Sequence, residues 1–464
     1  MNFTNNIFVI LLCLFFIIYF IFFEFRLDEN REINRRNRNH FIAIASLLFY
    51  MTWYPPAILL LFYHALLGKY GSRILAQKQN KKNLWIIIVF ALIPLLFFKY
   101  YNFFIDLLSI EMGKLELILP LGLSFYTFSM IGYYVDIYHR RVESNQDFLD
   151  ILLFITFWPH LAAGPILRAK NIFRNALKEE KLTEATVTLA VILICVGVVK
   201  KLLIADNIGA YVNWNISYGI EGMSIMDAWA TMLGFSAEIY ADFSGYSDMA
   251  IGFALLMGFK LPANFNYPYR ATSLTDFWHR WHISLSTWFR DYLYFPLGGS
   301  KKGNMRTYFN IMIVFVLSGL WHGAGIGFAI WGAIHGFILV LEKASEKYYF
   351  KISAKLRWVI TMILIVVAWS FFRLDYHDAM IIVEKMFGLH ESLFVNHTSP
   401  YYQFVIFFML LFPILDHLCR FYRVTDNGEL IANSNRIVII ILSVLIVLTF
   451  TFSGNPLPFI YFDF

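Results

Sequence analysis

Long apolar runs recur along the whole chain, and short polar or basic stretches separate them. These runs predict helices that cross a membrane, because a helix needs about 20 apolar residues to span the hydrocarbon core. Several runs are shorter, which predicts tilted or re-entrant segments around a funnel-like core, since irregular backbone at membrane depth needs protein or a water-filled cavity around it. We therefore predict an all-α, polytopic membrane protein of about 11 helices. Besides the first run, the predicted spans are 84–98, 119–134, 149–163, 185–199, 225–240, 249–259, 308–320, 326–341, 356–372, 402–418 and 437–452.

The first apolar run, 7–23, is interpreted as a retained helix, because no basic residue precedes it and no small-residue cleavage site follows it. The loop after it, 24–40, is rich in arginine. Basic loops tend to stay in the cytoplasm, so this loop is predicted to be cytoplasmic and the N-terminus to face outward. The stretch 41–67 is ambiguous: Tyr54-Pro55-Pro56 interrupts it, and either a short hairpin or one broken span fits.

The composition favours a single membrane domain, 1–464, with no sizeable soluble domain. Of the 464 residues, 59% are hydrophobic and 15% are charged, unlike ordinary soluble domains, so membrane lipid is expected around the protein. Many of the basic residues behind the net charge of +6 sit in short loops. Membrane orientation explains them without a nucleic-acid partner. The three cysteines lie far apart, in or beside apolar runs, so neither a disulfide framework nor a cysteine metal site is expected.

A segment rich in Trp, His and Arg differs from a plain membrane helix. Ser273-Leu-Thr-Asp276 matches a capping box, which predicts that a helix begins there and continues to Asp291. Asp276 and Arg280 are four residues apart and are predicted to pair. Two interpretations stay open: an interfacial helix with Trp at headgroup level, or a polar helix that lines a cavity. One side of this helix would carry Asp276, His279, His282 and Ser286, and no further ligand completes a metal site around the two histidines.

His322 lies in Ser318-Gly-Leu-Trp-His-Gly323, directly after an apolar run. The neighbouring glycines permit a close approach of backbone or substrate. Judged by its own neighbourhood, a single histidine in such a place is more often a satisfied structural group than a catalyst. The same holds for His335.

A third polar cluster, Glu238, Asp242 and Asp248, lies between two apolar runs. These carboxylates could orient a histidine, pair with Arg280 or Arg290, or cap helices, which is the ordinary role of Asp beside Gly. The G-x-S-x-G, C-x-x-C and P-loop patterns are missing from the sequence. Serine-hydrolase, redox and nucleotide-hydrolysing functions are therefore disfavoured.

Five stretches taken together resemble the membrane-bound O-acyltransferase family, in the branch that includes bacterial alginate and peptidoglycan O-acetylation proteins. They occur over 119–336, while the two ends match only as apolar helices. Several long motifs in the right order are a specific signal. The stretches are Leu119-Pro-Leu-Gly-Leu-Ser-Phe-Tyr-Thr-Phe128, Trp158-Pro-His-Leu-Ala-Ala-Gly-Pro-Ile-Leu-Arg168, Tyr240-Ala-Asp-Phe-Ser-Gly-Tyr-Ser-Asp-Met-Ala-Ile-Gly252, the run from Thr275 to Gly299, and Gly319-Leu-Trp-His-Gly323.

The resemblance implies that His322 corresponds to the family's catalytic histidine. It also implies that His282 occupies a second polar position, which other branches fill with Asn or His. An apolar setting favours the neutral imidazole that His322 needs to act as general base, and His282 would orient the thioester or the acceptor. Residues expected to bind substrate or to line the site are Asp242, Arg280, Trp281, Ser286, Arg290 and Trp321, and no metal is expected.

The reaction implied by the resemblance moves an acetyl group from cytoplasmic acetyl-CoA across the inner membrane to a hydroxyl on an extracytoplasmic polysaccharide or partner protein. No cofactor is expected to stay bound. In the resembled branch an extracytoplasmic partner, often with a serine-hydrolase-like fold, accepts or relays the acyl group. Because this chain shows no such domain, the resemblance implies a separate extracytoplasmic acyltransferase-like partner. Two alternatives stay open. One is a D-alanyl transfer protein of the teichoic-acid type, whose donor is a carrier protein. The other is a transporter or flippase that uses the Glu238, Asp242 and Asp248 cluster without esterification.

Overall fold

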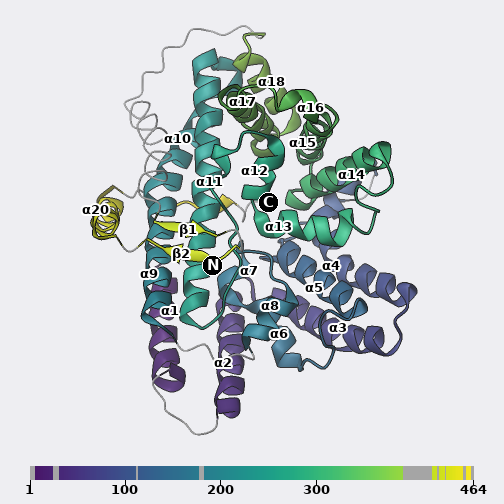
Figure 1. The fold of residues 1–464 in the computed structure, drawn as a ribbon, viewed down its shortest axis with the longest axis vertical. Coiled ribbons are helices and arrows are strands. Elements are labelled where there is room, and N and C mark those ends of the chain that lie inside the picture. Colours follow the sequence, from purple (N-terminus) through teal and green to yellow (C-terminus); the bar gives the residue numbers. More distant parts are fainter. Residues whose placement is uncertain are drawn as a thin grey trace. The chain divides into compact units, whose positions relative to one another are not determined.

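The computed structural model describes residues 6–24, 31–110, 113–176, 182–389, 421–425, 428–433, 435–452 and 456–460. These residues are mostly helical (Figure 1), and the strands among them are the antiparallel pair β1 (Tyr422–Val424) and β2 (Leu430–Ala432). The all-α prediction is confirmed. Contacts divide the chain into two compact units, Met1–Ala190 with Ala250–Leu261, and Val191–Met249 with Pro262–Phe464. The single functional domain expected over 1–464 stays a prediction.

Several helices meet the requirements for crossing a membrane. In the described part of the chain, four are long and apolar enough: Lys81–Leu107, Glu184–Ser217, Ile326–Ala344 and Ala354–Arg373. Two shorter apolar helices are Ile10–Phe23 and Arg436–Phe452. The protein is therefore a multi-pass membrane protein. The expected span 402–418 lies outside the described residues, and the total of about 11 spans stays a prediction.

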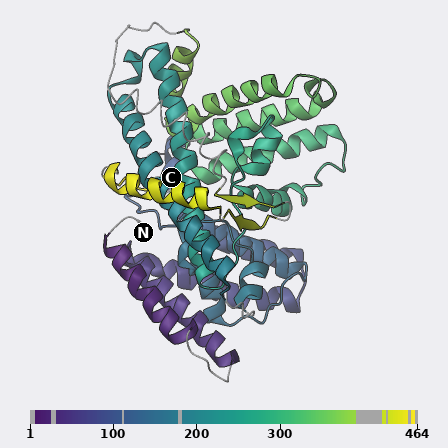
Figure 2. The ribbon, with the colours of Figure 1, turned by 60° about the vertical axis from the view of Figure 1, so that its left-hand side comes forward.

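In the first unit, the ambiguous stretch 41–67 forms two helices. Helix α2 (Arg31–Met51) ends before Pro55, and α3 (Ile58–Gln77) begins after the 3-10 turn η2 (Pro55–Ala57). Proline lacks the N–H that continues a helix, which explains the interruption. Figure 2 shows α1 (Asn6–Tyr19) and α2 side by side in purple. The other helices of this unit are η1 (Phe20–Glu24), α4 (Lys81–Leu107), α5 (Leu123–Tyr138), α6 (Phe148–Thr156), α7 (Trp158–Leu161) and α8 (Ala169–Ala176).

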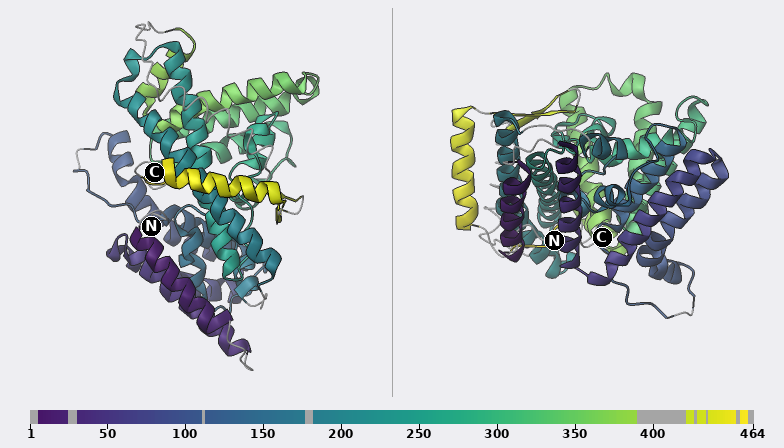
Figure 3. Two further views of the ribbon diagram at one scale, coloured as in Figure 1. Left: turned by 90° about the vertical axis from the view of Figure 1, so that its left-hand side faces the viewer. Right: turned by 90° about the horizontal axis from the view of Figure 1, so that it is seen from below.

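The chain from residue 184 onward contains the remaining helices. Helix α20 (Arg436–Phe452), yellow in Figure 3, packs against the π-helical turn η3 (Val199–Ala205). The others are α9 (Glu184–Val198), α10 (Asp206–Ser217), η4 (Ile220–Gly222), α11 (Ile225–Leu256), η5 (Pro268–Arg270), α12 (Leu274–Arg280), α13 (Ile283–Phe289), η6 (Arg290–Tyr294), α14 (Asn304–His322), α15 (Ile326–Ala344), α16 (Glu346–Tyr349), α17 (Ala354–Arg373) and α18 (Tyr376–Met386).

The helix that begins as α9 continues past its predicted end. The predicted span 185–199 stopped before two lysines, but the helix runs through both in η3 and on into α10. Lys200 Nζ lies 2.8 Å from an Asp248 carboxylate oxygen, and Lys201 Nζ lies 2.7 Å from one of Asp242. Lysines paired in this way can be buried in an apolar helix, whereas lone charges there are costly. The predicted end was therefore wrong.

The carboxylates of the third polar cluster lie within one long helix, α11, where the sequence predicted the two spans 225–240 and 249–259. Besides its lysine, Asp242 accepts a hydrogen bond from the backbone N–H of Ile460 at 2.9 Å. Asp248 accepts one from the Tyr422 hydroxyl at 2.8 Å. Because these partners satisfy the buried oxygens, the helix has no need to end at the cluster. The two aspartates thus pair with lysines and not with the arginines considered from the sequence.

Candidate active site

Helices α14 and α15 form a hairpin whose backbones approach closely enough to require glycine. A Cβ atom on Gly319 would overlap the carbonyl oxygen of Phe328, and one on Gly332 would overlap that of Phe315. This close contact fixes the end of α14, where His322 is the last residue of the helix. The small residues around His322 therefore have a packing role that accounts for their place in the sequence.

Replacing Gly319 with alanine should separate α14 from α15 and lower stability by about 1 to 3 kcal/mol, because an added methyl group meets backbone that cannot rotate away. Gly325→Ala is the matched control, since its nearest new contact would be an ordinary 3.5 Å from the Phe328 ring. Thermal unfolding of the two purified variants measures the difference. Equal melting temperatures for both variants would contradict the proposed packing.

His322 is buried, with 3% of its surface exposed, and aromatic rings surround it. Its ring centroid lies 4.8 Å from that of Trp321, 5.3 Å from that of Trp331 and 5.2 Å from that of Phe372. Edge-to-face packing of this kind holds the imidazole in one place within an apolar enclosure. Trp321, expected at the site from the sequence, is thus a direct neighbour of His322.

His282 lies beside His322, with 6.4 Å between their ring centroids. It is fully buried, and its ring packs edge-on against Phe243 at 4.7 Å. Burial lowers the pKa of His282, which lies outside the four long apolar helices, to about 3, because desolvation disfavours the charged imidazolium. The structure thus brings together, in one buried setting, the two histidines that the family resemblance implies are catalytic.

The helix predicted from Ser273 to Asp291 begins as expected but does not continue. The Ser273 hydroxyl accepts a hydrogen bond from the backbone N–H of Asp276 at 3.0 Å, so the predicted cap is confirmed, as is the pair of Asp276 with Arg280 at 2.7 Å. The helix then breaks between α12 and α13, where His282 has a left-handed backbone with φ of 43°. Because of this break, His279 is exposed while His282 is buried, and the shared side predicted for them was wrong.

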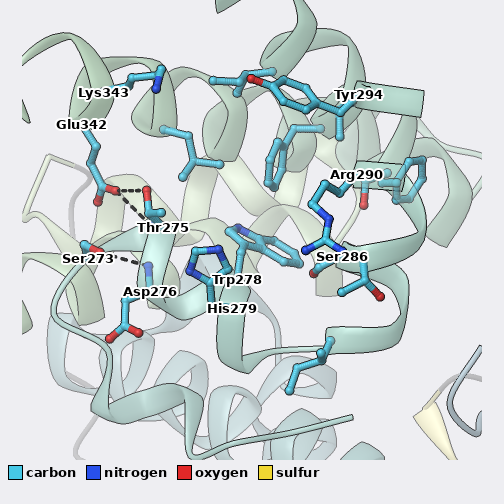
Figure 4. A pocket seen from close by; sticks show the side chains of 18 of the residues that line it. Ser273, Thr275, Asp276, Trp278, His279, Ser286, Arg290, Tyr294, Glu342 and Lys343 are labelled. Carbon is cyan, nitrogen blue, oxygen red and sulfur yellow. Dashed lines mark hydrogen bonds between the residues drawn. The ribbon is translucent and has the colours of Figure 1, made fainter. Parts of the chain in front are cut away.

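A cavity of about 760 Å³ lies between the α12–α13 segment and the α14–α15 hairpin, all within the second unit. Figure 4 shows Trp278, His279, Ser286 and Arg290 on its wall. Among the described residues that line it, neither His282 nor His322 occurs, although Ser318, four positions before His322, does. Ser286 and Arg290 therefore line this cavity, whereas His282 and His322 do not.

The other residues expected at the site have separate places. Trp281 is buried against Trp369, with 5.2 Å between ring centroids, and belongs to the aromatic enclosure. Arg280 pairs with Asp276, and Arg290 pairs with Asp291 at 2.8 Å. Asp242 lies in the ion-pair cluster with Lys201. Their expected roles in substrate binding stay predictions.

Three features of the second unit were missed from the sequence. Glu342 of α15 accepts hydrogen bonds from the backbone N–H groups of Leu274 and Thr275 at 2.6 and 3.0 Å, and so caps α12 (Figure 4). The pair Lys200 and Lys201 inside an apolar run was a signal for buried ion pairs. Asn264, which contacts His282, gave no sequence signal. Within the described residues, no group of three His, Cys, Asp or Glu side chains is placed to hold a metal ion.

Comparisons with known proteins agree on one family. The family model described as MBOAT, membrane-bound O-acyltransferase family, matches residues 139–375. The chain is 38% identical over 394 residues to the probable alginate O-acetylase AlgI of Pseudomonas aeruginosa, covering 81% of this chain and 72% of the relative. It is 32% identical over 485 residues to the peptidoglycan O-acetyltransferase of Helicobacter pylori, covering 91% of each. It is also 32% identical over 270 residues to the teichoic acid D-alanyltransferase of Bacillus subtilis, covering 55% of this chain and 67% of the relative.

Proposed function

The chain belongs to the membrane-bound O-acyltransferase family, and from this premise we propose that it passes an acetyl group from cytoplasmic acetyl-CoA to a hydroxyl group outside the membrane. The observation that carries the proposal is the buried pair of His282 and His322, with 6.4 Å between ring centroids. Relatives named for alginate and peptidoglycan O-acetylation support acetyl as the acyl group and a polysaccharide hydroxyl as the acceptor.

In the proposed step, His322 acts as general base. Its neutral imidazole takes the proton of the acceptor hydroxyl while that oxygen attacks the thioester carbonyl carbon, and a C–O bond forms. The tetrahedral intermediate collapses, the C–S bond breaks, and the imidazolium returns the proton to the leaving thiolate. His282 orients the acceptor. The histidine ends the step as it began, so it can serve repeated transfers.

The cavity between α12–α13 and α14–α15 is the proposed route for the donor. Its volume of about 760 Å³ suits a small-molecule ligand. Its wall carries the basic side chains Lys343 and Arg357, which attract phosphate groups. The loop before α14 contains Lys301 and Lys302, and the bias of basic loops favours the cytoplasmic side for this end of the hairpin.

Reversing the charge at Lys343 should weaken donor binding. Lys343→Glu places a carboxylate on the cavity wall, and repulsion of the donor phosphates on the order of 1.4 kcal/mol raises the KM for acetyl-CoA about tenfold. Lys302→Glu is the matched control, because Lys302 is exposed and lies outside the cavity lining. Steady-state kinetics of both purified variants measures the effect. An equal KM for acetyl-CoA in the two variants would show that the donor does not bind in this cavity.

We further propose that the protein lies in the inner membrane with its N-terminus outward, as the arginine-rich loop after the first helix suggests. The proposed acceptor lies outside the membrane, so an extracytoplasmic acyltransferase-like protein, of the kind that the family resemblance implies, is proposed as partner. That partner either relays the acetyl group or presents the polysaccharide.

A D-alanyl transfer function is the second candidate, because the teichoic acid D-alanyltransferase of Bacillus subtilis matches over 55% of this chain. Its proposed donor would be a carrier-protein thioester. Membranes that contain the protein, supplied in turn with radiolabelled acetyl-CoA and with a radiolabelled D-alanyl carrier protein, distinguish the two donors. Alkali-labile label from acetyl-CoA alone supports our proposal, and label from the carrier protein alone overturns it. Substrate movement without any ester would instead indicate the transporter alternative.

A further inference from the structure

The loop that precedes α12 is joined to the break at His282 by backbone hydrogen bonds. The N–H of Asn266 donates to the carbonyl oxygen of Arg280 at 2.9 Å, and the N–H of Ile283 donates to that of Asn264 at 2.9 Å. Asn264 is buried, with 1% of its surface exposed. These bonds place the Asn264 side chain next to the imidazole of His282.

The amide group of Asn264 can face this environment in only one orientation. Its Oδ1 atom lies 3.2 Å from the backbone nitrogen of Ser284, and a backbone N–H can only donate. The Ser284 hydroxyl also donates to Oδ1, at 2.8 Å, while Nδ2 donates to the Ser247 hydroxyl at 3.2 Å. A flipped amide would set its NH₂ group against the Ser284 N–H, so the oxygen must lie on the histidine side.

This orientation determines the tautomer of His282. Its Nδ1 atom lies 3.1 Å from Asn264 Oδ1, which is an acceptor only. If Nδ1 carried a lone pair, two acceptors would face each other at hydrogen-bond distance, so Nδ1 carries the proton. The Ser284 hydroxyl is farther from Nδ1, at 3.5 Å, and is already engaged with Oδ1. In neutral His282 the lone pair therefore lies on Nε2.

We propose that Asn264 is a positioning residue that holds His282 in the Nδ1–H tautomer, so that Nε2 accepts a hydrogen bond from the acceptor hydroxyl. The second half of this inference rests on the proposed acyl transfer. Because burial lowers the pKa of His282 to about 3, its Nε2 stays unprotonated and can accept a hydrogen bond from the hydroxyl, while the proposed step assigns the role of base to His322. The two histidines thus have different roles.

Nitrogen-15 NMR of histidine-labelled protein in nanodiscs tests the tautomer without any need for activity. The His282 signals are identified by their loss in His282→Gln. We expect the wild-type protein to have a protonated Nδ1 and an unprotonated Nε2, and Asn264→Ala to lose this preference. Asn264→Asp keeps the acceptor oxygen and should keep the tautomer. This variant provides the test if Asn264→Ala fails to fold. Asn310→Ala, at a buried asparagine bonded to the Gly299 carbonyl, is the matched control and should leave the His282 signals unchanged.

Kinetics completes the test. Asn264→Ala should raise the KM for the acceptor about tenfold, the equivalent of one lost hydrogen bond, while the KM for the donor stays within twofold. A protonated Nε2 in the wild-type protein, or an unchanged tautomer in Asn264→Ala, overturns the inference. So does an equal rise in both KM values. If the tautomer is as expected but the wild-type protein transfers no acyl group, the proposed function fails while the placement of Asn264 beside His282 stands.

Discussion

Replacing His322 with alanine should lower the rate of acyl transfer by about 10²-fold to 10⁴-fold, the range that the loss of a general base accounts for. Aromatic rings enclose the His322 imidazole, and 6.4 Å separates its ring centroid from that of His282. Expression and membrane insertion should be unchanged, because they depend on the apolar helices. Ester content of the acceptor, measured by release in alkali, gives the rate.

His335→Gln is the matched control for this variant. His335 is as buried as His322 and also packs against Trp331, with 4.7 Å between ring centroids. It accepts a hydrogen bond at Nδ1 from the Trp278 indole N–H at 3.3 Å, which is a structural contact. We expect this variant to lose about 1 to 3 kcal/mol of stability and to keep most of its transfer rate per folded molecule. The assignment of His322 fails if His322→Ala retains transfer, or if both variants lose it equally.

The second large effect should come from the ion pair of Lys200 with Asp248. The two side chains are 5% and 6% exposed, so Lys200→Met leaves a buried carboxylate without its cation. Such a change costs about 3 to 5 kcal/mol, which would leave little folded protein. The double variant Lys200→Met with Asp248→Leu should recover part of the loss, since an apolar pair replaces the charges while the Tyr422 hydroxyl loses the carboxylate to which it donates. Thermal unfolding in detergent measures all three proteins.

This prediction also bears on the transporter alternative. If the pair is structural, the rate of acyl transfer per folded molecule should be unchanged in the double variant. A double variant that folds well but transfers nothing would place the ion pair in the functional pathway. A single variant as stable as the wild-type protein would show that water reaches the Asp248 carboxylate.

The sequence predicted best what depends on local pattern. Apolar runs predicted the helices, and Ser273 and Asp276 predicted the start of α12, because a cap depends on residues three positions apart. The predicted end at residue 199 was wrong because Lys200 pairs with Asp248 of α11, 48 positions away, and Lys201 pairs both with Asp242 of α11, 41 positions away, and with Asp206, which lies close by in α10. Only the folded chain reveals that these charges are neutralised.

In the candidate site, too, some features could be predicted from the sequence and others could not. The family resemblance selected His282 and His322, and the structure places their rings side by side. Neither the break in the helix at His282 nor the contact with Asn264 could be predicted, because both depend on a loop that precedes α12. Capping and helical spacing are read from one segment of the sequence at a time, whereas the contact of Asn264 with His282 joins two segments, the loop before α12 and the break after it.

In the proposed function, acetyl groups pass across a membrane through the histidine pair. Purified protein in sealed vesicles tests it most directly, with radiolabelled acetyl-CoA on the cytoplasmic face only, and the acceptor polysaccharide together with the extracytoplasmic partner on the other. We predict alkali-labile label on the acceptor from vesicles with the wild-type protein and none above background with His322→Ala. Label on the acceptor at equal rates in both preparations, or none in either, would contradict the account.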